Sequence, residues 1–95
     1  VWVEGYIVGF INRKDSYKPT FTAEGCNEVS NVLIAKEASD TVVYMPIELP
    51  SGEVRNALNL KANPTNLGKK VKVYGILEEF FFMPGVKGIT KFELQ

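Results

Sequence analysis

The residues in this sequence that are best suited to bind a ligand are three consecutive phenylalanines, Phe80, Phe81 and Phe82, followed by Lys87. Aromatic rings stack on nucleobases at roughly 1–3 kcal/mol each, and they also stack on sugar rings. A lysine beside such rings adds a favourable charge for a phosphate backbone. This cluster predicts a binding surface for an oligonucleotide or an oligosaccharide.

Further candidates lie in the polar stretch 13–29 and in the apolar stretch 42–49. The predicted ligand-binding residues are Tyr17, Lys18, Tyr44, Phe80, Phe81, Phe82 and Lys87. Packing competes with binding for every aromatic in this set, because three exposed phenylalanines in a row would form a sizeable apolar patch. The basic residues of 13–29 share the stretch with acidic ones, so a solvated mixed-charge surface is the competing interpretation there.

The residues needed for catalysis are scarce. The chain has no histidine, so the common general base and the commonest metal ligand are both missing. Cys26 is the only cysteine, which excludes an internal disulfide and predicts a small, part-buried thiol. Glu78 and Glu79 are neighbours on an expected strand, so their carboxylates point to opposite faces. The sequence therefore predicts a binding protein and not an enzyme, with no catalytic residue, metal or cofactor.

Length and charge narrow the possible partners. Ninety-five residues, 45% of them apolar, predict a single domain over 1–95. Eleven basic and eleven acidic residues give a net charge of zero, which counts against strong nonspecific nucleic-acid binding because that affinity comes mostly from phosphate neutralisation. No apolar run reaches the roughly 18–20 residues that span a bilayer. The chain opens without an initiator Met, which predicts a trimmed or processed fragment, and its oligomeric state is left open.

Alternating apolar residues predict five strands, over 1–12, 31–36, 42–49, 69–79 and 89–94. In the first strand, one face is expected to carry positions 3, 5, 7, 9 and 11, and the other face positions 2, 4, 6, 8 and 10. Glycines at 5, 9 and 75 predict strands that bend around a small barrel. The stretch 13–29 is expected to be a long first loop, and 80–88 a hairpin connection.

One helix is predicted after the third strand. Ser51 is expected to be its N-cap, Glu53 favours its first turn, and Asn63-Pro64 is expected to end it. The element order β-β-β-α-β-β predicts an all-β protein with one short helix, a five-stranded Greek-key barrel of the OB type. An SH3-like barrel is the alternative, but it lacks such a helix between its third and fourth strands. In an OB fold, strands two and three and the loops 1–2 and 4–5 form the ligand face, which would gather the candidate residues.

Several segments also resemble a known family. They are the first-strand sequence Val3-Glu4-Gly5-Tyr6-Ile7-Val8-Gly9, the stretches Leu49-Pro50-Ser51-Gly52 and Asn66-Leu67-Gly68-Lys69, and most of 71–78 with Pro84-Gly85-Val86-Lys87. Together they resemble an uncharacterised OB-like domain family of secreted or surface proteins of gut bacteria. The resemblance covers most of the chain except 13–29. It implies an OB-like fold, an extracytoplasmic setting, often in a lipoprotein or a larger surface protein, and nucleic-acid binding by fold analogy.

Two functions from different classes remain open at this point. The aromatic residues near the expected ligand face predict a module for single-stranded nucleic acid. The zero net charge and the family resemblance favour an interaction module that contacts glycan, protein or a neighbouring domain of a cell-surface protein. A purely structural spacer, with no ligand, is a third interpretation.

Overall fold

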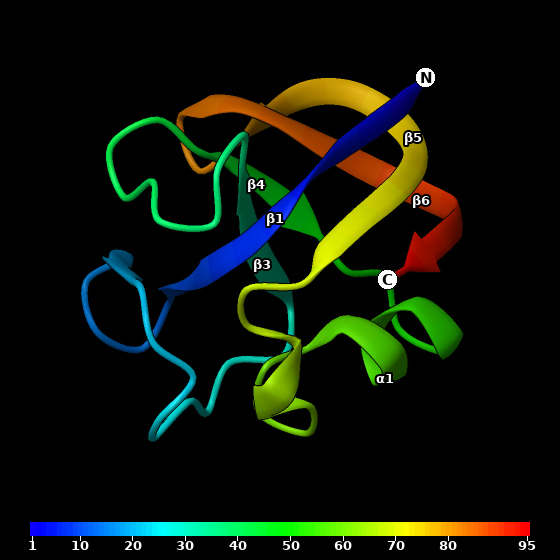
Figure 1. Cartoon of the computed structure of the whole chain (residues 1–95). Helices are drawn as coiled ribbons and strands as arrows, with labels where there is room; N and C mark the ends of the chain where they lie inside the picture. Colours follow the sequence, from blue (N-terminus) through cyan, green and yellow to red (C-terminus); the bar gives the residue numbers. More distant parts are fainter.

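The computed structural model describes all residues from 1 to 95, and about half of them lie in strands (Figure 1). The elements are β1 Trp2–Asn12, β2 Lys18–Thr20, β3 Asn31–Ala35, β4 Met45–Glu48, α1 Glu53–Leu58, a 3-10 turn Pro64–Asn66, β5 Lys70–Phe80 and β6 Met83–Leu94. The predicted mostly-β class with one short helix is confirmed. No helix in the chain is both long enough and apolar enough to cross a membrane.

Five of the six strands form a closed ring of pairings. β1 pairs with β3, β3 with β4, β4 with β6, β6 with β5, and β5 returns to β1. Every pairing is antiparallel except that of β4 with β6, which is parallel. The short β2 adds to β1 as a sixth strand. Figure 1 shows the strands wrapped around a common centre, with α1 below them.

The main core fills this ring. Ile7, Ile47 and Val86 are fully buried and come from three different strands of the ring. Leu58 and Leu60, at the end of α1 and just after it, are fully buried in the same cluster. Burying one such side chain contributes about 1.5–3 kcal/mol, so the helix is held in place by the apolar residues that it adds to the core.

The two faces of β1 differ from the predicted alternation. The pairing of β1 with β3 shifts register between Ile7 and Gly9. Ile7 and Phe10 therefore enter the main core, whereas Val8 and Ile11 join a second cluster with Leu33. The expected grouping of positions 7, 9 and 11 on one face is wrong, because a bulge inserts one extra residue and reverses the alternation beyond it.

Gly9 lies where the backbone of β2 crosses close to β1. A Cβ atom at this position would collide with the carbonyl oxygen of Thr20. We expect Gly9→Ala to lower the free energy of unfolding by about 2 kcal/mol, because the paired backbones must separate to admit the methyl group. Urea unfolding followed by circular dichroism measures this change, and a difference below about 0.5 kcal/mol would show that β2 adapts freely.

The start and end of the helix also differ from prediction. Gly52 precedes the helix, at φ 108°, and no side chain caps it, so the expected cap at Ser51 is wrong. A backbone φ of that size favours glycine, which explains why the helix begins one residue later than a serine cap would place it. The helix ends at Leu58, and Asn63-Pro64 begins the 3-10 turn instead of ending α1.

Three further boundaries differ in ways that affect the site. The loop predicted over 13–29 contains β2, and the connection predicted over 80–88 is a two-residue turn. The strand predicted over 42–49 begins only at Met45, because the Asp40 carboxylate accepts hydrogen bonds from the backbone N–H groups of Val42 and Val43 and holds them in a loop. The longer hairpin of β5 and β6 carries the phenylalanines out to its tip.

Candidate functional site

Both hairpins that reach the candidate site have strained tips. The turn between β5 and β6 consists of Phe81 at φ 54° and Phe82 at φ 63°. In the loop between β1 and β2, Ser16 and Tyr17 have φ values of 55° and 56°. A left-handed backbone costs a residue with a Cβ roughly 1–2 kcal/mol, and such turns normally use Asn and Gly. Strain of this kind is concentrated at functional sites, so the aromatic tips are candidates for a binding role.

The two tips meet and form a continuous aromatic surface. The ring of Tyr17 lies 5.7 Å from the ring of Phe81, and the rings of Phe81 and Phe80 lie 4.1 Å apart, centre to centre. The ammonium group of Lys87 lies 5.3 Å from the centre of the Phe80 ring. We call Tyr17, Phe80 and Phe81 the aromatic platform. It joins the loop after β1 and the turn between β5 and β6 into one surface.

The platform residues differ in how firmly they are held. Phe81 packs against the second cluster, formed by Val8, Ile11, Leu33 and Ala35. Tyr17 is 58% exposed, and Phe82 beside the platform is 94% exposed. Phe81 therefore anchors the tip, whereas Tyr17 and Phe82 present their rings to solvent.

Two clefts border the platform and share its three rings. The first, of about 390 Å³, is lined in addition by Arg13, Ser30, Glu48, Pro50 and Arg55, and we call it the arginine cleft. The second, of about 360 Å³, is lined in addition by Glu79, Phe82 and Lys87. Each cleft thus combines an aromatic wall with at least one cation and one carboxylate. Such a combination suits a planar ligand that carries both donors and acceptors.

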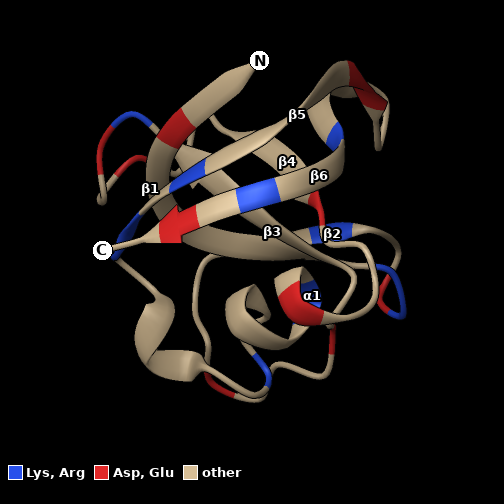
Figure 2. Cartoon of the chain, turned by 90° about the vertical axis from the view of Figure 1, so that its right-hand side faces the viewer, with Lys and Arg blue, Asp and Glu red and all other residues tan.

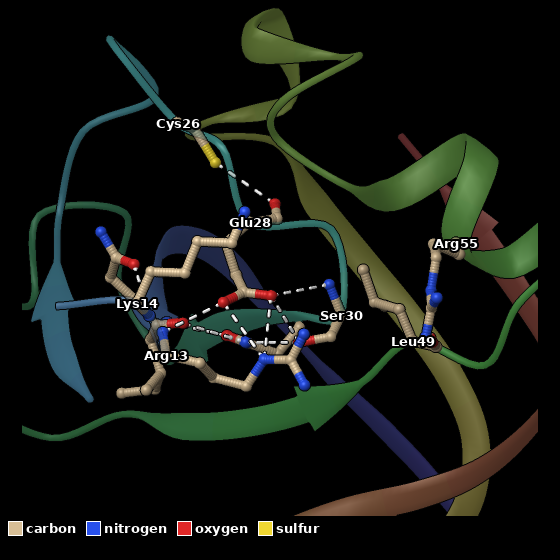
Figure 3. A network of polar contacts seen from close by, with 10 residues as sticks. Arg13, Lys14, Cys26, Glu28, Ser30, Leu49 and Arg55 are labelled. Atoms are coloured by element: carbon tan, nitrogen blue, oxygen red, sulfur yellow. Dashed lines mark hydrogen bonds and ion pairs between the residues drawn. The ribbon is translucent and has the colours of Figure 1, made fainter. Parts of the chain in front are cut away.

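Arg13 is fixed at the arginine cleft by a buried carboxylate. Its backbone N–H donates to Glu28 Oε1 at 3.0 Å, and its Nε lies 3.2 Å from Oε2. Ser30 donates its hydroxyl to the same carboxylate at 2.8 Å (Figure 3). Although burial alone would raise it, the hydrogen bonds from Ser30 and Arg13 hold the pKa of Glu28 below its ordinary value. Glu28 is only 3% exposed, so it remains an ionised, fully used acceptor that orients Arg13.

Arg55 is fixed in a similar way from the other side. It lies on α1, and its Nε donates to the carbonyl oxygen of Leu49 at 2.9 Å (Figure 3). Arg55 and Glu79 line the clefts but were not predicted as site residues from the sequence. The signal for Arg55 is weak, because an isolated arginine on a short helix normally forms part of a solvated surface.

The structure brings together five of the seven predicted binding residues, namely Tyr17, Phe80, Phe81, Phe82 and Lys87. Lys18 is exposed on β2 and lines none of the clefts. Tyr44 packs edge-on against Phe21 at 5.5 Å and covers the second cluster, so it lies outside the two platform clefts. Lys18 and Tyr44 therefore do not share these two clefts with the phenylalanines, and their part in binding stays a prediction. The bulge in β1 gives the second cluster an apolar surface, and Tyr44 and Phe21 shield it.

Tyr44 instead borders the largest concavity of the molecule, about 520 Å³, between β1 and the loop before β4. Two of the charges at its rim are paired, since the Lys70 ammonium lies 2.9 Å from the Glu4 carboxylate, whereas Lys36 and Glu37 at the same rim form no ion pair. The hydrogen bond from Lys70 holds the pKa of Glu4 below its ordinary value. Figure 2 shows basic and acidic segments interspersed on the strands, and the net charge of the chain is zero.

The thiol of Cys26 packs against the main core and donates to the carbonyl oxygen of Glu28 at 3.3 Å. Burial raises its pKa, so the thiol stays protonated near neutral pH. Cys26 is half-buried, as the sequence predicted, and it supports the segment that carries Glu28.

The exposed tip residue Phe82 provides a test of the strain. We expect Phe82→Gly to raise the free energy of unfolding by about 0.5–1 kcal/mol, because glycine removes the left-handed strain and the lost ring buries almost nothing. Phe82→Ala is the matched control, since it removes the ring but keeps the Cβ and its strain. Guanidinium unfolding of both variants measures the difference. Equal stability of the two would show that the turn stores no strain.

These features define a small, mostly-β domain with an aromatic site at two hairpin tips. The family described as "Domain of unknown function (DUF6359)" matches residues 1–95, and the chain belongs to this family. The chain is also similar to a protein of Bacillus subtilis (strain 168) named Endonuclease YhcR, with 36% identity over 89 residues. This match covers 92% of the chain but only 7% of the length of that endonuclease. No solved structure matches the chain.

Proposed function

We propose that this chain is a non-catalytic OB-fold module that binds single-stranded nucleic acid across the aromatic platform. The ring order supports the OB assignment. When the five ring strands are numbered along the chain (β1, β3, β4, β5 and β6 as one to five), their order around the ring is 1-2-3-5-4, as in an OB fold. The helix α1 lies between the third and the fourth of them. An OB fold uses its loops 1–2 and 4–5 to hold oligonucleotides. Those two loops carry Tyr17 and Phe81 here.

The observation that carries the proposal is the contact between Tyr17 and Phe81, which joins two distant segments into one stacking surface. Base stacking on such a surface tolerates every sequence, because each base has a π-face. The ammonium group of Lys87 lies over the Phe80 ring and supplies a cation for a phosphate of the bound strand.

The relative named an endonuclease supports the same ligand class. A protein with that name acts on nucleic acid, and the similar segment forms a small part of its length. A separate module could hold the strand while a catalytic domain elsewhere in such a protein cleaves it. The non-catalytic assignment rests on this chain's lack of histidine and on the protonated Cys26.

The proposal is tested by fluorescence anisotropy with a labelled oligo-dT strand and an equivalent RNA at low salt. Binding should weaken slightly with salt, with a slope of log K against log salt of about −0.7, because the one platform cation, Lys87, displaces about 0.7 counterions from a single strand. No binding at high micromolar protein concentration would overturn the proposal.

An interaction module for glycans is the second candidate, and the concavity of about 520 Å³ favours it. Tyr6 and Tyr44 line this concavity, and its paired charges at Glu4 suit a neutral, hydroxyl-rich ligand. A glycan array is the direct test. Glycan binding that is lost in Tyr6→Ala and kept in Tyr17→Ala would favour this candidate over the first.

A further inference from the structure

The arginine cleft holds unpaired donors and an unpaired acceptor side by side. The Nε atoms of Arg13 and Arg55 are used by Glu28 and Leu49, whereas no hydrogen bond in the chain uses their terminal Nη atoms. The Glu48 carboxylate lines the same cleft and has no cation within 4.0 Å. Both arginines are held in place at Nε, so their terminal donors are oriented before any ligand arrives.

The charges of this cleft decide what kind of ligand fits. Glu28 lies against Arg13, and Glu48 offsets Arg55, so the two cations and two anions balance. A bare phosphate would gain little in such a neutral cleft and would be repelled by the free carboxylate of Glu48. A neutral, planar group with donors on one edge and acceptors on another matches the cleft better, and the platform rings supply a wall for stacking.

Among the nucleobases, guanine has this pattern of edges. Its N1–H and N2–H₂ groups are adjacent donors, which a carboxylate accepts, and its O6 and N7 are adjacent acceptors, which arginine donors match. Thymine offers no comparable pair of adjacent donors. The volume of about 390 Å³ falls in the range of small-ligand pockets and is sufficient for one base.

We infer that the arginine cleft selects a guanine base of the bound strand, with Glu48 accepting from N1–H and N2–H₂ and Arg13 and Arg55 donating to O6 and N7. This inference rests on the proposed function, because the strand must first be held by the platform. It adds a sequence preference to a surface whose stacking alone would be indifferent to sequence.

The test compares an oligo-dT strand with the same strand carrying a central guanine, using the 95-residue chain and fluorescence anisotropy. The guanine strand should bind about tenfold more tightly, since a good bidentate base contact discriminates by a factor of this order. Inosine, which lacks the N2 amino group, and 7-deazaguanine, which lacks the N7 acceptor, should each lose most of the advantage.

The variant Glu48→Gln should abolish the preference for guanine, so that the guanine strand binds no more tightly than oligo-dT. Glu53→Gln, an exposed carboxylate on α1 outside the cleft, is the matched control and should keep the preference. Equal binding of the dT and guanine strands, or an equal loss for both in Glu48→Gln, would overturn the inference while leaving strand binding intact. If neither strand binds, the proposed function fails and the inference with it.

Discussion

Tyr17→Ala should weaken the binding of single-stranded nucleic acid by about 10- to 100-fold, because it removes the exposed ring that completes the aromatic platform. Stacking of one base on one ring contributes about 1–3 kcal/mol, which corresponds to this range. Tyr17 is 58% exposed and contacts the site through Phe81, so its loss should affect binding far more than folding. Anisotropy titration with oligo-dT measures the affinity, and the unfolding midpoint reports on stability.

The chain offers a matched control for this prediction. Tyr74 is also exposed, and its ring lies 5.3 Å from that of Trp2, on strands away from the hairpin tips. Tyr74→Ala removes an equivalent ring pair outside the platform and should leave the affinity unchanged. If both variants lose affinity equally, the ligand follows another surface. If neither does, the platform is only a packing contact between two loops.

Glu28→Ala should lower the free energy of unfolding by about 3 kcal/mol. The Glu28 carboxylate is 3% exposed and accepts hydrogen bonds from Arg13 and Ser30. Removing one partner of a buried charged pair leaves the other groups without their acceptor, and losses of this size are typical. Arg13 is half exposed and can reach water, which keeps the expected loss at the lower end of that range. Denaturant unfolding at pH 7 is the measurement.

The same carboxylate should make the free energy of unfolding fall at acid pH. We call this fall the acid limb of the stability profile. The pKa of Glu28 in the folded chain lies below its ordinary value of 4.5, which the unfolded chain is expected to show. The unfolded state therefore binds the proton more readily, so this contribution is complete above the unfolded pKa and is lost as pH falls through the folded pKa. Glu28→Gln should flatten this part of the stability profile below pH 4.5.

The exposed carboxylate of Glu93 provides the control for the pH measurement, because Glu93→Gln should leave the acid limb unchanged. An acid limb that survives in Glu28→Gln would assign the pH dependence to other carboxylates. A Glu28 variant that loses stability but keeps the full preference for the guanine strand would show in addition that Arg13 needs no orientation by Glu28 to select the base.

Local patterns in the sequence were sufficient to predict the class of the fold and part of the candidate site. Alternation of apolar residues predicted β1, β3 and β5 nearly to their ends, and Leu58 followed from a helical stripe. These features depend on neighbours in sequence, which is why periodicity reports them. The phenylalanines and Tyr17 were identified as candidates by residue type, together with their expected places in the loops of an OB fold.

Only the tertiary structure decided the features that depend on residues distant in sequence. The bulge in β1 arises from its pairing with β3, and it exchanged Phe10 for Ile11 in the main core. The turn that gathers Phe80 and Phe81 forms because β6 begins at Met83, a boundary set by pairing with β5. Arg55 and Glu48 reach one cleft from a helix and a strand. Residue types can thus suggest a chemistry, but long-range strand pairing determines which side chains meet.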